Sequence, residues 1–171
     1  MIVARPHPAS IDPAELLRSC TIRRSRSSGP GGQHRNKVET AITIIHEPTG
    51  VLASATERRS AEENRRVAIG RLRLALAVEV RTPVPEGDQR SELWRSRATG
   101  GSVRVSARHE DYPAMIAEAL DMTLACAGDA GAAAARLVCS PSQLLKLLRS
   151  HAPALAAVNR ERVKSGLHPY K

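Results

Sequence analysis

The residues best suited to chemistry lie in one short segment, Gly29-Pro30-Gly31-Gly32-Gln33. Three glycines and a proline among five positions exclude this segment from a helix interior or a central strand. Glycine reaches positive φ without steric cost and has no side chain that keeps a partner at a distance. We therefore expect a loop whose main-chain N–H groups can come close to a bound substrate.

Basic residues surround this glycine-rich segment, and no acidic residue lies between Glu15 and Glu39. A loop inside such a positive stretch indicates a polyanionic substrate, most simply RNA. The cations of this interval are Arg18, Arg23, Arg24, Arg26, Arg35 and Lys37.

The whole chain of 171 residues is basic, with a formal net charge of +9, and its apolar fraction of 42% is enough for a core. Arginine strongly outnumbers lysine. This bias fits phosphate binding by guanidinium groups, but it also fits the codon composition of a GC-rich genome. Recognition by base stacking is disfavoured because the aromatic residues are few. They are Trp94, Tyr112 and Tyr170.

The three cysteines, Cys20, Cys126 and Cys139, are odd in number and form no C-x-x-C pair. This pattern predicts reduced thiols in a cytoplasmic protein, with neither a metal site nor a cofactor. The sequence also has no apolar run long enough for a membrane span and no signal-peptide pattern. We expect a soluble monomer without a membrane partner.

The elements around the glycine-rich segment predict an α+β domain over residues 10–82, with a small mixed sheet and a long helix packed on it. Asp12-Pro13 is a helix start, Pro48-Thr49-Gly50 is a turn between two strands, and Ser60 with Glu63 is a capping box. Residues 1–9 are expected to be disordered. The predicted elements are a helix at 13–18, strands at 20–26, 41–46 and 51–56, a helical turn at 36–40 and a helix at 61–80.

The second half predicts an all-α domain over residues 93–168, joined by a Pro- and Gly-containing linker at 83–92. Trp94 is expected to be a packing anchor at the junction. Helices are predicted near 113–126, 130–137, 141–150 and 153–165, with a short strand or an extended segment at 102–107.

Residues 130–149 have the outline of a helix-turn-helix, which would suggest a DNA-binding regulator. A plain helical hairpin is the alternative. Its turn at Val138-Cys139 lacks glycine, and Lys146 and Arg149 are the only cations of the second helix. A helix that reads a DNA groove usually carries more basic contacts.

The segment from Arg26 to Asn36 resembles the Gly-Gly-Gln signature of class I peptide chain release factors and of their short, codon-independent relatives that rescue stalled ribosomes. Gly-Gly-Gln alone is weakly specific. The resemblance continues, however, through about residues 13–80 with the family's order and spacing. It includes Pro48-Thr49-Gly50, Glu57-Arg58, Ser60 and Asn64-Arg65.

The resemblance implies hydrolysis of the ester that joins a nascent peptide to tRNA, in the ribosomal peptidyl-transferase centre. Gly31, Gly32 and Gln33 would be the catalytic residues. Gln33 cannot be a general base because its amide does not titrate, but it can orient water and donate its backbone N–H to an oxyanion. The partners would be large-subunit ribosomal RNA and peptidyl-tRNA. The residues expected to bind RNA are Arg23, Arg24, Arg26, His34, Arg35, Lys37, Arg58, Arg59, Arg65 and Arg66.

Three departures from the family pattern affect this expectation. Only 28 residues precede Gly29, too few for the codon-reading domain of full-length factors, so we expect codon-independent release. The last fifteen residues are a weak version of the basic tail of the short rescue factors. Glu62 and Glu63 stand where relatives usually carry polar or basic residues.

A non-catalytic ribosome- or RNA-binding protein that retains the fold is the alternative to a hydrolase. The net charge and the arginine bias fit it. The glycine-rich segment argues against it, because simple binding gives no physical reason to keep a run of glycines with a high entropic cost of ordering.

Overall fold

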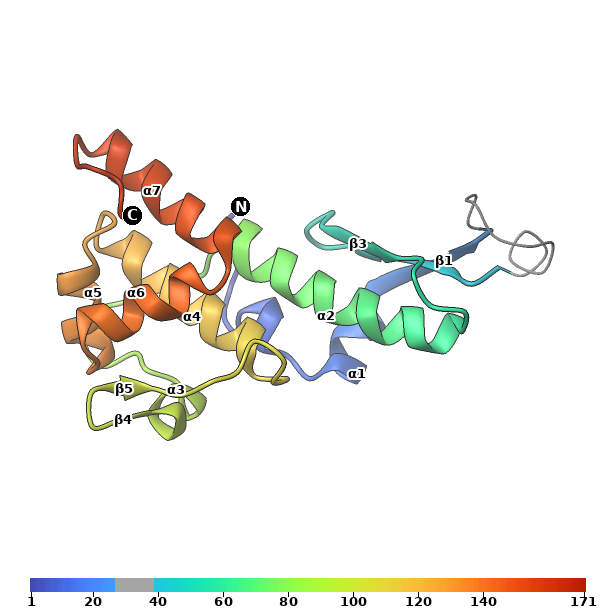
Figure 1. Ribbon diagram of the computed structural model, residues 1–171, viewed down its shortest axis with the longest axis horizontal. Helices are drawn as coiled ribbons and strands as arrows, with labels where there is room; N and C mark the ends of the chain where they lie inside the picture. Colours follow the sequence, from blue (N-terminus) through green and yellow to red (C-terminus); the bar gives the residue numbers. More distant parts are fainter. Residues whose placement is uncertain (27–38) are drawn as a thin grey trace.

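The computed structural model describes residues 1–26 and 39–171 of the chain. Its sheet and its C-terminal helices lie at opposite ends, with a long helix between them (Figure 1). The first elements are η1 (Pro8–Ser10), α1 (Pro13–Leu16), η2 (Leu17–Ser19), β1 (Cys20–Ser25), β2 (Ala41–His46), β3 (Leu52–Ala55) and α2 (Ala61–Glu79). The later elements are α3 (Glu92–Arg97), β4 (Ala98–Thr99), β5 (Ser102–Val103), α4 (Tyr112–Ala125), α5 (Ala130–Leu137), α6 (Pro141–Arg149) and α7 (Ala152–Lys164).

The sheet is β1-β2-β3, and both of its strand pairs are antiparallel. The predicted mixed sheet is therefore wrong, although the three strands themselves are confirmed. A parallel pair needs a crossover connection, usually a helix, that returns the chain to the starting end of the sheet. Helix α2 cannot serve as one because it follows β3, so the sheet has antiparallel pairing between chain neighbours.

Helix α2 covers one face of this sheet. Alternate residues of the two strands nearest to it are buried, including Ile42, Ile44 and Ala55, as the two-residue period of a strand requires. The helix begins as its capping residue predicts, since Ser60 Oγ accepts a hydrogen bond from the Glu63 N–H at 3.4 Å. Leu72 of this helix is completely buried.

The N-terminal residues are packed, so the predicted disorder over residues 1–9 is wrong. Val3 N–H donates to the Arg81 carbonyl at 2.9 Å, and Arg81 N–H donates to the Met1 carbonyl at 2.8 Å. His7 is buried with Nε2 3.0 Å from the Val80 carbonyl oxygen, and this burial lowers its pKa. The partners are more than seventy residues away, so the local composition of residues 1–9 held no signal for this packing.

The part of the chain after α2 is not entirely helical as predicted, because β4 and β5 form a small antiparallel pair. Strand β5 lies within 102–107, predicted as a short strand or an extended segment, whereas no strand was predicted at β4. A strand of two residues is too short for a periodic signal in the sequence. Trp94 is a packing anchor as expected. It is completely buried, and its indole N–H donates to the Leu137 carbonyl at 2.9 Å.

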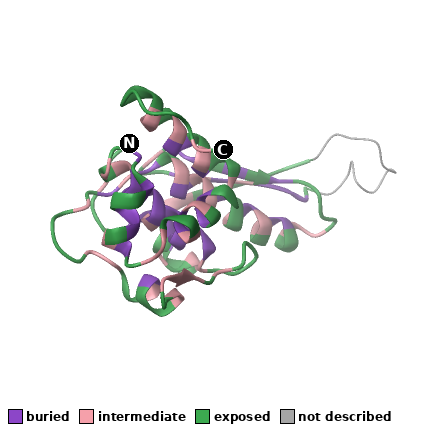
Figure 2. Ribbon diagram, turned by 60° about the vertical axis from the view of Figure 1, so that its left-hand side comes forward, coloured by how far each residue is buried: buried purple, intermediate pink, exposed green. Residues whose placement is uncertain are grey.

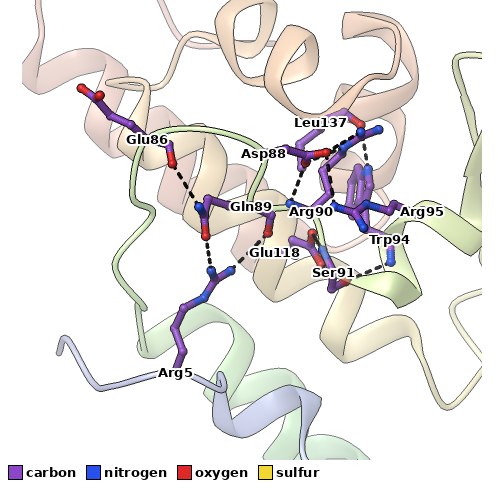
Figure 3. A network of polar contacts seen from close by, with 10 residues as sticks. All are labelled: Arg5, Glu86, Asp88, Gln89, Arg90, Ser91, Trp94, Arg95, Glu118 and Leu137. Atoms are coloured by element: carbon purple, nitrogen blue, oxygen red, sulfur yellow. Dashed lines mark hydrogen bonds and ion pairs between the residues drawn. The ribbon is translucent and has the colours of Figure 1, made fainter.

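Residues 83–92, predicted to be a linker, are held by a network of polar contacts (Figure 3). Arg5 donates to the Gln89 side chain at 2.8 Å. Glu118 of α4 accepts hydrogen bonds from the Ser91 N–H and hydroxyl, and burial raises the pKa of this carboxyl. The segment is therefore attached both to the N-terminal residues and to the helical part.

Helices α2 and α4 pack together, and the buried apolar residues form one cluster that runs from the sheet into the helical part (Figure 2). The cluster includes Ile44 of β2, Leu76 of α2, Leu120 of α4 and Leu148 of α6. The division into domains at 10–82 and 93–168 stays a prediction. Among the described residues, no helix combines the length and the apolar character that a membrane span requires.

Helices α5 and α6 lie where the sequence predicts them, and the turn between them contains an unusual backbone conformation. Val138 has φ 53° and ψ 47°, the left-handed region, and is 56% exposed. A β-branched residue in this region is strained. Whether the two helices form a helix-turn-helix motif stays a prediction.

Replacing Val138 with glycine should raise the free energy of unfolding by up to about 1 kcal/mol, because glycine adopts the left-handed conformation without a Cβ clash. Urea denaturation would measure the change. Val163→Gly is the matched control, since Val163 is 61% exposed but lies inside α7. It should lower stability by a few tenths of a kcal/mol. A Val138→Gly variant no more stable than wild type would contradict the strain assignment.

Candidate functional site

The glycine-rich segment lies in the chain between β1 and β2, and the structure describes the chain up to residue 26 and from residue 39. Ser25 at the end of β1 pairs with Ala41 at the start of β2. Arg26 Nε lies 4.0 Å from a carboxylate oxygen of Glu39, with both side chains largely exposed. Arg26 and Glu39 therefore lie just beyond two neighbouring strands, at one end of the sheet.

Several predicted site residues lie outside the described residues, as does most of the helical turn predicted at 36–40. Glu39 and Thr40, the described part of that turn, belong to neither a helix nor a strand. The site residues outside the described part are Gly31, Gly32, Gln33, His34, Arg35 and Lys37.

Asn64, in the first turn of α2, joins the return end of this segment to the rest of the domain. Its side chain is completely buried. The amide Nδ2 donates to the Thr40 carbonyl at 2.6 Å and to the Arg58 carbonyl at 3.0 Å, while Oδ1 accepts from the Arg58 N–H at 2.9 Å. One buried amide therefore fixes three chain segments: the residue before β2, the turn before α2 and the helix itself.

Sequence reasoning included Asn64 in the family resemblance but gave it no role. The available signal was a polar amide followed three and four residues later by Val67 and Ala68, on the side of the helix that faces the sheet. Buried polar groups are hydrogen-bonded in nearly all proteins, so an asparagine at that position predicts a specific backbone partner.

Glu57 and Arg71 hold the turn between β3 and α2. Arg71 Nη2 donates to Glu57 Oε1 at 2.6 Å, and its Nη1 donates to Glu57 Oε2 at 3.2 Å and to the Ser54 carbonyl at 2.8 Å. The Thr56 N–H donates to the same carboxylate at 2.9 Å. The N–H groups of Thr56 and Glu57, with the Arg71 guanidinium, lower the pKa of Glu57.

The basic residues of β1 do not gather on one face of the sheet. Arg23 and Arg24 are both exposed, but successive strand residues point to opposite faces. Arg24 is opposite buried Ile42, on the side that α2 covers, whereas Arg23 is opposite Thr43 on the outer side. A single flat RNA surface cannot contact both guanidinium groups through the same face.

A second basic group surrounds the beginning of α2. Arg58, Arg59 and Arg66 are exposed and Arg65 is half-buried. Glu62 lies 3.9 Å from Arg65 and 3.6 Å from Arg66. Exposed ion pairs of this kind contribute little free energy, so they leave these arginines available to a phosphate group.

Replacing Asn64 with alanine should lower the free energy of unfolding by about 1–3 kcal/mol, because the Thr40 carbonyl and the Arg58 backbone lose buried partners. Hydrogen exchange should accelerate at the Arg58 amide. Asn159→Ala is the matched control: its Nδ2 donates to the Tyr170 carbonyl at 3.0 Å and its Oδ1 accepts from the Tyr170 N–H at 2.8 Å. Its effect should be confined to the C-terminal segment. Unchanged exchange at Arg58 in Asn64→Ala would refute the role.

Comparison with known proteins connects this geometry to a family. Residues 9–113 match the RF-1 domain family, a stretch that contains the glycine-rich segment, Asn64 and the turn before α2. The match also extends beyond the resemblance seen in the sequence, through residues 83–92 to the beginning of α4.

Individual relatives agree with this family. The chain is 49% identical over 67 residues to "Peptide chain release factor 1" of Xylella fastidiosa (strain 9a5c), covering 39% of this chain and 18% of the relative. It is 32% identical over 113 residues to the protein of the same name from Chlorobaculum tepidum, covering 66% and 31%. It is 36% identical over 88 residues to the protein of the same name from Chloroherpeton thalassium, which covers 52% of this chain and 24% of that relative.

The chain thus spans about a fifth to a third of the length of these curated relatives. The family match, in contrast, covers more than half of this chain and includes every residue of the candidate site. The protein therefore belongs to the RF-1 domain family.

Proposed function

We propose that this protein hydrolyses the ester bond of peptidyl-tRNA on the ribosome and releases the nascent peptide. The observation that carries the proposal is that the Gly-Gly-Gln segment belongs to the matched region and lies in the chain between the paired strands β1 and β2, while a buried asparagine holds the residue before β2. Membership of the RF-1 domain family and the name of the relatives, peptide chain release factor, support the same reaction.

The proposed chemistry needs only a placed water and a donor for the developing negative charge. Water attacks the ester carbonyl, the tetrahedral oxyanion accepts a hydrogen bond, and the 3′ hydroxyl of the tRNA leaves with a proton. In this scheme the Gln33 backbone N–H donates to the oxyanion and its side chain orients the water. Gly31 and Gly32 allow the main chain to approach. One oxyanion donor contributes a factor of about 10²–10³ in rate.

The exposed arginines at the two ends of the segment support an RNA partner. Arg23, Arg24 and Arg26 lie on and after β1, and a second group lies around the start of α2. On the proposed function, these guanidinium groups contact phosphates of large-subunit RNA or of the tRNA. Their division between two faces of the sheet fits a site enclosed by RNA on more than one side. The basic residues within the segment, His34, Arg35 and Lys37, complete the proposed set.

The finer part of the proposal is that release is independent of a stop codon and acts on stalled ribosomes. It rests on the resemblance of the Gly-Gly-Gln region to the short rescue factors. It is separable from the hydrolysis itself, because codon dependence and ester cleavage can be measured in one assay.

Release of labelled peptide from ribosomes that carry peptidyl-tRNA, with and without a stop codon in the A site, tests both parts. Wild type should release peptide in both complexes. Gly32→Ala should lose about 10²-fold or more in rate, since a Cβ at this position would displace the oxyanion donor. Gly131→Ala in α5, outside the matched region, is the control and should keep the wild-type rate.

Three results would contradict the proposal in different ways. Absence of release by wild type would refute ester hydrolysis and favour a non-catalytic RNA-binding protein. Full release by Gly32→Ala would refute the role of this segment in the hydrolysis. Release only in the complex with a stop codon would keep the hydrolysis and refute codon independence.

A further inference from the structure

A groove of about 450 Å³ lies between α2 and the segment that precedes α4. One side of it comes from α2, with Ile69 and Gly70 among its residues. The opposite side comes from residues 107–113, which the sequence analysis assigned to no site. The groove therefore lies between α2 and the segment that leads into α4, within the matched residues 9–113.

Gly70 is unusual because it lies in the middle of a helix of 19 residues and is exposed there. Glycine is less stable than alanine in a helix interior. A Cβ added to Gly70 would meet nothing within 4 Å. The fold thus gives no steric reason for glycine at this position, whereas a ligand that approaches the helix backbone would.

The charge of the groove selects an anionic ligand. Its lining contains three guanidinium groups, those of Arg66, Arg73 and Arg108, but one carboxylate, that of Glu110. Arg108 is exposed, and the Arg66 side chain is 76% exposed and 3.6 Å from Glu62. Arginine binds phosphate in bidentate fashion. A basic rim beside an apolar wall matches the alternating phosphate and ribose of an RNA backbone.

The wall opposite α2 is held in place by the protein itself. Arg73 is buried and donates through Nη1 to the Glu110 carbonyl at 2.8 Å and through Nη2 to the Ala9 carbonyl at 3.0 Å. Arg97 donates to the neighbouring Asp111 carboxylate at 2.6 Å. A ligand therefore meets a preformed groove, which reduces the entropic cost of binding.

We infer that this groove binds an RNA sugar-phosphate backbone, with Gly70 as the point of closest approach and Arg66 and Arg108 on the phosphates. The inference rests on the proposed function for the nature of the partner. It adds a second contact surface, outside the Gly-Gly-Gln segment, that includes residues from the C-terminal half.

Substitution of Gly70 by alanine separates a structural role from a binding role. The melting temperature of Gly70→Ala should rise by about 2–4 °C, while affinity for purified large ribosomal subunits and for a fluorescent RNA duplex should fall about tenfold. Arg108→Gln should weaken binding to the subunits and to the duplex. It should also reduce the slope of log affinity against log salt concentration by the amount expected for the loss of about one phosphate contact. Arg104→Gln is the control, because Arg104 is exposed nearby and does not line the groove.

These measurements of binding are made in a Gly32→Ala background, so they do not depend on peptide release. Wild-type affinity in both Gly70→Ala and Arg108→Gln would overturn the groove proposal even if release is active. A lower melting temperature for Gly70→Ala would also overturn it, by showing that the fold needs the glycine.

Weakened binding to subunits with unchanged binding to the duplex would mean that the groove binds a protein partner, and would refute an RNA ligand. Weakened binding to both, in a protein that releases no peptide, would support the groove and leave the proposed function refuted.

Discussion

The burial of Asn64 is the constraint on which the arrangement of the candidate site depends. An amide that is completely removed from water must find partners within the protein, and here all of them are backbone groups of Thr40 and Arg58. Because backbone groups cannot change rotamer, these hydrogen bonds determine where β2 begins relative to α2. The Glu57–Arg71 pair then fixes the intervening turn against the same helix.

The arginine content of this protein serves two separate purposes. Arg73 is buried and Arg81 is partly buried, and both bind carbonyl or carboxylate groups of the fold; Arg81, for example, lies 2.8 Å from Asp121. Burial lowers the pKa of both guanidinium groups. Arg58 and Arg59, in contrast, are exposed around the start of α2. The net charge of +9 therefore combines structural cations with cations available to a partner, and only a structure separates the two.

Local signals predicted much of the fold correctly. The capping serine at position 60 placed the start of α2, and the turn at Pro48-Thr49-Gly50 placed β2 and β3, because these features act within a few residues. The packing of His7 against Val80 and the contact between Arg73 and Ala9 could not be predicted, since each joins residues far apart in the chain. For the same reason the sequence identified Asn64 as part of a motif but not as the junction of three segments.

Helix α2 contacts both the sheet and α4, so it acts as a spacer between them. Its 19 residues correspond to about 28 Å at the rise of an α-helix. Asn64 is at one end of this spacer and Ala77, packed in the shared core, is at the other. The number of residues in the helix therefore sets the rotation of one end about the helix axis relative to the other end. One inserted residue would rotate Asn64, and with it the start of β2, by about 100° about the helix axis relative to the C-terminal helices. The length of α2 can therefore change only together with both of the structures that it connects.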